Sequence, residues 1–198
     1  DREVQEFVVH QEMLTKRSEF SRRAMNGNWA ATDTRVITLD DIEPLNFQIY
    51  ANLVYTNLIA IDQEDEEYLD TWAGVFVVAE RLQDVQAKII FVAAFHKKFT
   101  VPDSRIVTEV YEGTVKGNKM RRYMVDLYCA KSPKRLKAYF EEDDPDYYCH
   151  DFLFGLILAA RSPVNAKRKW KVHDVQEYME SIEQPAQLSD QTQEHPGQ

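Results

Sequence analysis

The sequence predicts an α+β fold in which a small β-sheet is flanked by helices and followed by an α-helical extension. Two short runs of β-branched and aromatic residues, 4–9 and 36–39, are typical of strands, and helical patterns lie between and after them. Residues 69–99 then carry apolar residues at helical spacing over a broad face. From residue 100 to residue 182 the pattern stays helical, which predicts the extension.

The first strand and the first helix follow directly from residue spacing. Val8 points away from Phe7 and Val9 in an extended segment, so an alternating run over 4–9 predicts a strand. The next apolar residues recur every three or four positions, and Gly27 ends that run, which predicts one helix. The residues of its stripe are Met13, Leu14, Arg17, Phe20 and Ala24.

The second strand-like run, at 36–39, leads into a second helix. Asp40 and Asp41 offer side-chain oxygens that cap a helix start, and Pro44 fits the first turn. Asn57 stands where the apolar stripe stops, and Asn readily adopts the left-handed conformation of a helix end. We therefore expect a helix from about Pro44 to Asn57.

The remaining helices are predicted from caps and stripes. Asp84 divides residues 69–99 into two consecutive helices, and Asn118 caps a later one. Residues 131–146 end in an acidic run that predicts a solvated loop, and the alternative is a short helix anchored by Leu136, Tyr139 and Phe140. The composition of 183–198 predicts a disordered tail. The two later stripes are Met120, Tyr123, Met124, Leu127 and Tyr128, then Cys149, Phe152, Leu153, Leu156, Ile157 and Ala160.

Composition narrows the class of protein. The formal net charge of −9 would repel a phosphate backbone, which argues against nucleic acid as a partner. Cys129 and Cys149 are the two cysteines, too few for a disulfide-based secreted domain, so we expect reduced thiols inside the cell. No apolar stretch is long enough to span a membrane, and because the chain starts at Asp1 without a Met, we expect the natural chain to begin earlier.

The chemically reactive residues show no catalytic or metal-binding spacing. The histidines and cysteines lack a nucleophile elbow or ligand motif around them, and no glycine-rich phosphate loop exists, so we expect no enzyme activity, no metal and no cofactor. His10, at the end of the first strand, is interpreted as structural. The rival hypothesis is an enzyme or small-molecule-binding domain on the helical extension. Its pocket would be lined by Tyr111, Tyr123, Tyr128, Tyr147 and Tyr148.

Three blocks of sequence resemble BTB/POZ domains. The first is 7–10 with the helix behind it, where a strand delivers a Val-His pair into a helix; the second is 37–41 with 53–57; the third is Ala79–Leu82 with Asp84. The resemblance implies a BTB/POZ domain over 1–99, with the family's first strand, ahead of Asp1, absent. The region 100–182 is similar to the helical extension of fungal BTB proteins.

The resemblance implies a non-catalytic protein-interaction module. Such a module self-associates or recruits partners, as a homodimer or a BTB heterodimer, and some members are substrate adaptors for cullin-type ubiquitin ligases. The implied dimer face contains Met13, Leu14 and Phe20. The implied cullin contact contains Ile59, Ile61, Glu64 and Tyr68, although Glu64 stands one residue late for the family's hydrophobic-x-Glu triplet, and a solvated loop over 62–67 is the alternative.

One basic cluster precedes the tail. It is Lys167, Arg168, Lys169 and Lys171 around Trp170, a composition that fits a nuclear-import signal or, less well, a nucleic-acid contact. The alternative is a solvated helix face beside an acidic body. We expect an intracellular protein in the cytoplasm, the nucleus or both.

Overall fold

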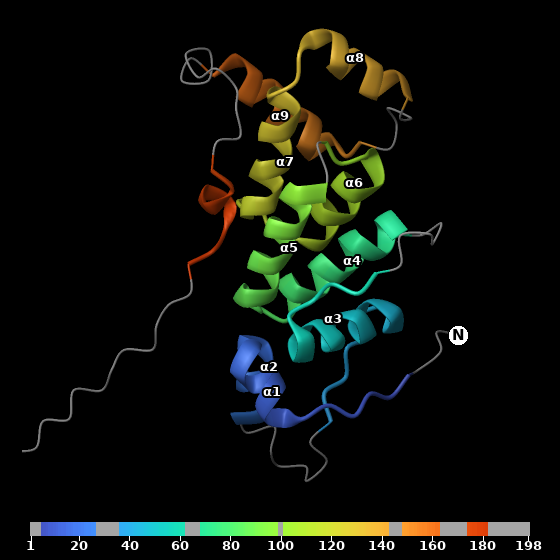
Figure 1. Ribbon diagram of the computed structural model, residues 1–198, viewed down its shortest axis with the longest axis vertical. Coiled ribbons are helices and arrows are strands. Elements are labelled where there is room, and N and C mark those ends of the chain that lie inside the picture. The colour runs from blue at the N-terminus through green and yellow to red at the C-terminus, as the bar shows by residue number, and fades with distance from the viewer. Residues whose placement is uncertain are drawn as a thin grey trace, which may run out of the picture.

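The computed structural model describes residues 5–26, 36–61, 68–98, 101–142, 148–162 and 174–181. Figure 1 shows the helices stacked along one long axis, with α1 and α2 at one end and α8 and α9 at the other. In chain order the helices are α1 (Gln11–Arg17), α2 (Glu19–Asn26), α3 (Pro44–Thr56), α4 (Tyr68–Arg81), α5 (Val85–Lys98), α6 (Ser104–Gly113), α7 (Lys119–Cys129), α8 (Pro133–Glu142), α9 (His150–Arg161) and the 3-10 helix η3 (Val175–Tyr178).

The predicted α+β fold is wrong, because the described residues contain helices and no strand. The two runs predicted as strands, 5–9 and 36–39 as far as they are described, have extended backbone without β-pairing. Alternating side chains favour an extended backbone, but a strand also needs a neighbour that exchanges hydrogen bonds with it. The small sheet of the BTB/POZ fold is therefore not formed by this part of the chain.

The first predicted helix is divided into α1 and α2 at Ser18. The Ser18 backbone is extended, and its hydroxyl donates to the Leu82 carbonyl at 2.6 Å while accepting from the Ser21 amide at 2.9 Å. Ser18 is fully buried. A long-range contact to the end of α4 thus breaks a helix that the local spacing alone predicts as continuous.

Helix α3 begins and ends as predicted, but without the predicted cap. Pro44 lies in the first turn and Asn57 ends the helix in the left-handed conformation, at φ 57°. The capping position belongs to Glu43, whose side chain makes no capping bond. Asp41 lies two residues too early to cap and instead forms an ion pair with Arg81 at 3.1 Å.

Helices α4 and α5 form the buried centre of the molecule. The helix caps predicted at Asp84 and Asn118 are confirmed. Asp84 accepts from the Ala87 amide at 2.9 Å, and Asn118 accepts from the Met120 amide at 2.8 Å. The ring of Trp72 on α4 meets Phe91 on α5 edge-on, with 5.0 Å between ring centres.

One hydrophobic core includes α4 and α5 and continues through α6 and α7 to η3. Helix α6 packs along α4, so the residues on both sides of position 100 share this core. Helix α8 corresponds to the short helix that the sequence offered as an alternative around Leu136. The rest of the acidic run, 143–146, and the predicted tail 183–198 lie outside the described residues.

Candidate partner-binding groove

The N-terminal end of the molecule contains a pocket of about 290 Å³. It is bounded by the two extended segments, by α1, α2 and α3, and by the turn after α4. Most of its lining is apolar, and its residues are Phe7, Val9, Gln11, Leu14, Phe20, Ser21, Met25, Ile37, Leu39, Phe47 and Leu82. We call this pocket and the extended segments 5–9 and 36–39 the N-terminal groove.

Side chains of both extended segments alternate between the groove and solvent. Phe7 and Val9 line the groove, whereas Val8 between them is 95% exposed. Ile37 and Leu39 also line it, whereas Val36 is 73% exposed. The period of two is that of a β-strand, so each segment presents one apolar edge to the same space.

The backbone of these segments is not used within the described chain. Residues 5–9 and 36–39 make no backbone hydrogen bond to another described residue. Extended backbone whose amides and carbonyls lack protein partners is a template for an added strand, because a second strand can form hydrogen bonds with these groups. The groove therefore combines an apolar lining with two extended segments whose backbone makes no hydrogen bond to another described residue.

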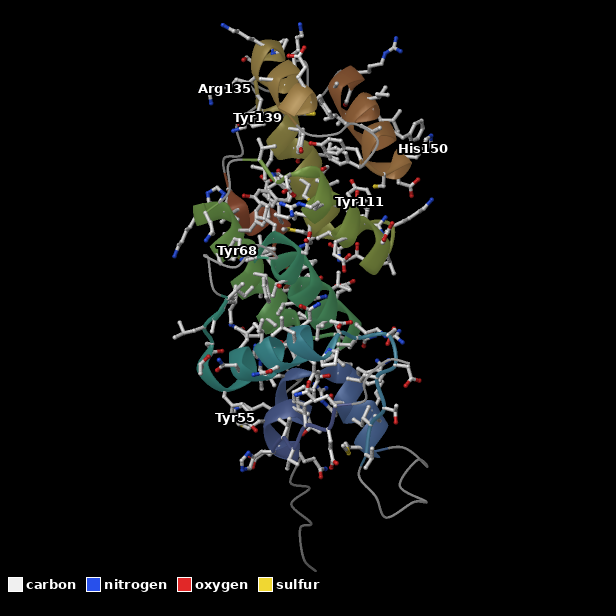
Figure 2. The ribbon with its side chains drawn as sticks, turned by 90° about the vertical axis from the view of Figure 1, so that its right-hand side faces the viewer. Tyr55, Tyr68, Tyr111, Arg135, Tyr139 and His150 are labelled. Carbon is white, nitrogen blue, oxygen red and sulfur yellow. The ribbon has the colours of Figure 1, made fainter. Side chains whose placement is uncertain are left out.

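Aromatic contacts hold the first extended segment on α3. The Phe7 ring lies 5.0 Å from Phe47, and Phe47 lies 6.2 Å from Tyr50. At the end of the segment, the His10 amide donates to the Tyr55 hydroxyl at 2.9 Å, and His10 Nδ1 lies 2.9 Å from the same oxygen. Figure 2 shows Tyr55 at this end of the molecule. These bonds fit the structural role predicted for His10.

A buried polar network fixes the helices next to the groove, and the sequence analysis missed it. Arg17 Nε lies 3.2 Å from Asp84 Oδ2, and Tyr50 donates to the same oxygen at 3.1 Å. Arg17 also donates to Asn57 at 2.9 Å. Burial raises the pKa of Tyr50, and the Asp84 charge raises it further. The signal in the sequence was Asp84, which was interpreted only as a helix cap.

The predicted dimer face lies at the groove and is not a flat outer patch. Met13, Leu14 and Phe20 are all partly buried against the core. Leu14 and Phe20 line the pocket, whereas Met13 does not. The structure thus brings two of the three predicted residues together around one concave site.

The predicted cullin-contact residues lie on the connection between α3 and α4. Ile59 and Ile61 are partly buried and pack against the core. Tyr68 begins α4, where Lys98 Nζ lies 4.3 Å from the centre of its ring. Glu64 and the basic cluster Lys167, Arg168, Lys169 and Lys171 lie outside the described residues.

The tyrosines of the rival pocket are packed in the helical extension. Tyr128 is fully buried, donates to the Pro102 carbonyl at 2.6 Å and lies 2.8 Å from the Tyr148 hydroxyl. Burial raises the pKa of Tyr111 and of Tyr123 to about 12. The Tyr123 hydroxyl lies 2.7 Å from His96 Nδ1. Tyr147 lies outside the described residues.

Both cysteines are free thiols. Burial raises the pKa of Cys129 to about 11, and it also raises that of Cys149. A raised pKa keeps a thiol protonated at neutral pH and lowers its nucleophilicity.

The described part of the chain contains no cluster of three or more His, Cys, Asp or Glu side chains arranged to hold a metal ion. None of the helices in this part of the chain has the length and apolar content needed to cross a bilayer.

Comparison with known proteins gives no relative. No protein-family model, no curated protein and no solved structure matches the chain. Functional inference therefore depends on the geometry of the groove and on the chemistry of its lining.

Proposed function

We propose that this chain is a non-catalytic protein-interaction module that recruits a partner through the N-terminal groove. The observation that carries the proposal is the pair of extended segments that line one apolar pocket and make no backbone hydrogen bond to another described residue. Strand addition uses this combination, because main-chain bonds supply affinity and pockets for alternate side chains supply specificity. The partner segment is extended, with apolar side chains at every second position.

The size of the pocket fits two apolar side chains of such a segment. A protein cavity of about 150 Å³ accepts one benzene-sized group, so 290 Å³ accepts about two. In a strand, side chains at positions i and i+2 lie on the same face, about 7 Å apart. The net charge of −9 favours a partner segment that is neutral or basic at its polar positions.

The rival function, catalysis or small-molecule binding in the helical extension, lacks a comparable observation. The hydroxyls of Tyr128 and Tyr148 bond each other in a buried aromatic cluster, which is how core tyrosines are satisfied. The raised thiol pKa values favour protonated, weakly nucleophilic cysteines. We therefore favour recruitment over chemistry.

A relationship of residues 1–99 to BTB/POZ domains is a proposal based on the three sequence blocks alone. From that relationship we also propose self-association, pairing with another BTB protein and recruitment of a cullin. An intracellular location is proposed on the same basis and is supported by the two free thiols.

The experiment is a binding titration of the 198-residue chain with labelled eight-residue peptides that alternate Val or Ile with Thr or Lys. A scrambled peptide of equal composition is the control. We expect the alternating peptides to bind and the scrambled peptide to bind at least tenfold more weakly, as followed by fluorescence anisotropy.

Two matched pairs of variants locate the binding. Ile37→Asp and Val9→Asp place a charge inside the groove, whereas Val36→Asp and Val8→Asp place the same charge on the exposed face. We expect the first pair to weaken peptide binding at least tenfold and the second pair to change it less than twofold, with circular dichroism confirming the fold. Binding that is absent, or that all four variants weaken equally, contradicts the proposal.

A further inference from the structure

The outward face of α9 carries a row of apolar side chains in solvent. Phe154, Ile157 and Leu158 are 54%, 56% and 55% exposed, and Phe152 is the buried residue of this helix. The spacing i, i+3, i+4 places the three exposed residues on one face. Figure 2 shows α9 at the end of the molecule remote from α1, with His150 at its outer edge. A contiguous exposed apolar patch marks an interaction surface.

The opposite face of α9 is already used by the chain itself. Helix α9 packs on α7, and a side chain added at Gly155 would come within 3.6 Å of Val125 on that helix. The inner face of α9 therefore packs against the core, and its outer face is available to a second molecule.

Opposite charges stand at the two ends of the same outer face. Asp151 lies in the first turn of α9 and Arg161 in the last. At about 100° per residue, both side chains point within about 60° of Phe154 around the helix axis. Asp151 pairs with Lys116 at 3.4 Å, but the Lys116 side chain is 85% exposed, so this pair contributes little.

This pattern is self-complementary about the middle of the helix. Asp151 and Arg161 each lie five residues from Leu156, and Phe154 and Leu158 each lie two residues from it. A two-fold axis at the level of Leu156 therefore places Asp151 of one copy opposite Arg161 of the second copy. The same axis places Phe154 opposite Leu158. Antiparallel helices also bring opposite ends of the two helix dipoles together.

We propose that a second copy of this chain covers α9, with the two α9 helices antiparallel. Phe154 of one copy packs against Leu158 of the other, Ile157 lies next to the two-fold axis, and Asp151 pairs with Arg161 at both ends. Each surface is used once in such an isologous contact, so the assembly closes at a dimer. The few apolar residues per copy predict weak association, at concentrations of about 100 µM.

Sedimentation equilibrium of the 198-residue chain tests this proposal. We expect a monomer–dimer equilibrium that Ile157→Glu weakens at least tenfold. Asp151→Arg and Arg161→Asp each place like charges opposite one another and weaken the dimer about tenfold, whereas the double variant restores it. Lys137→Glu, on the exposed surface of α8, is the control and leaves the equilibrium unchanged.

Only a dimer that pairs Asp151 with Arg161 is weakened by each single charge reversal and restored by the double variant. All three altered positions of α9 are exposed, so thermal unfolding should match that of the unchanged chain within a few degrees. A monomer at every concentration overturns the proposal. A dimer that Ile37→Asp dissociates and Ile157→Glu leaves intact also overturns it, because that result places self-association at the N-terminal groove.

Discussion

The N-terminal end and the centre of this molecule use apolar residues in different ways. In the centre, α4 and α5 bury Trp72, Phe76, Phe91 and Phe95 almost completely, and the helices satisfy their own backbone. At the N-terminal end, the side chains of Phe7, Val9, Ile37 and Leu39 are only partly buried. Their backbone makes no hydrogen bond to another described residue. The difference indicates that stability comes from the centre and that the groove is available for recognition.

Removing one aromatic side chain from each region should give the largest contrast. Phe91→Ala leaves a cavity in the centre and should lower the free energy of unfolding by about 3–5 kcal/mol. Phe7→Ala removes a partly exposed ring at the groove and should lower it by about 1 kcal/mol. Urea unfolding followed by circular dichroism measures both. Equal losses would show that the groove is part of the stabilising core.

The next contrast concerns two ion pairs of similar length. Asp84 is fully buried and contacts Arg17 and Tyr50, whereas Asp41 and Arg81 are both more than half exposed. Asp84→Asn leaves the Arg17 charge without its partner and should lower the free energy of unfolding by about 3 kcal/mol. Asp41→Asn should lower it by less than about 1 kcal/mol. Urea unfolding measures both losses. A loss below about 1 kcal/mol for Asp84→Asn would contradict the structural role of the buried polar network.

A further prediction concerns the dependence of stability on pH. Burial raises the pKa of Tyr123 to about 12, compared with about 10 for a tyrosine in an unfolded chain. A raised folded-state pKa means that the neutral form is favoured by folding, so this contribution to stability is intact below pH 10 and is lost as the pH rises toward 12.

The tyrosinate absorbance near 295 nm measures this effect. We expect part of the titration to occur only near pH 12, and Tyr123→Phe to remove one tyrosine from that late phase. Complete ionisation of the tyrosines near pH 10 in the folded chain would contradict the burial of Tyr123.

Local signals in the sequence predicted several helix ends correctly. Asp84, Asn118 and Asn57 act at helix ends as their chemistry predicts, because caps depend on bonds within one turn. The break at Ser18 and the absence of strand pairing depend on distant residues, which spacing does not contain. The cap predicted at Asp40 and Asp41 is absent because α3 begins at Pro44, which makes Glu43 the capping residue.

The candidate sites were only partly predictable for the same reason. Leu14 and Phe20 were identified, but the groove itself required the fold to bring Phe7 and Ile37 to one pocket. The α9 surface was predicted as a buried stripe that included Ile157, which is 56% exposed. Because α9 is apolar around most of its circumference, the sequence does not reveal which face meets the core.

The most direct test of the groove is amide hydrogen exchange of the intact chain with and without the alternating peptide. In the free chain we expect the amides of 5–9 and 36–39 to exchange rapidly, because no described residue bonds them. Peptide binding should slow both segments together while α4 and α5 stay unchanged. Protection of both segments in the free chain, or exchange that the bound peptide leaves unaltered, would contradict recruitment by strand addition.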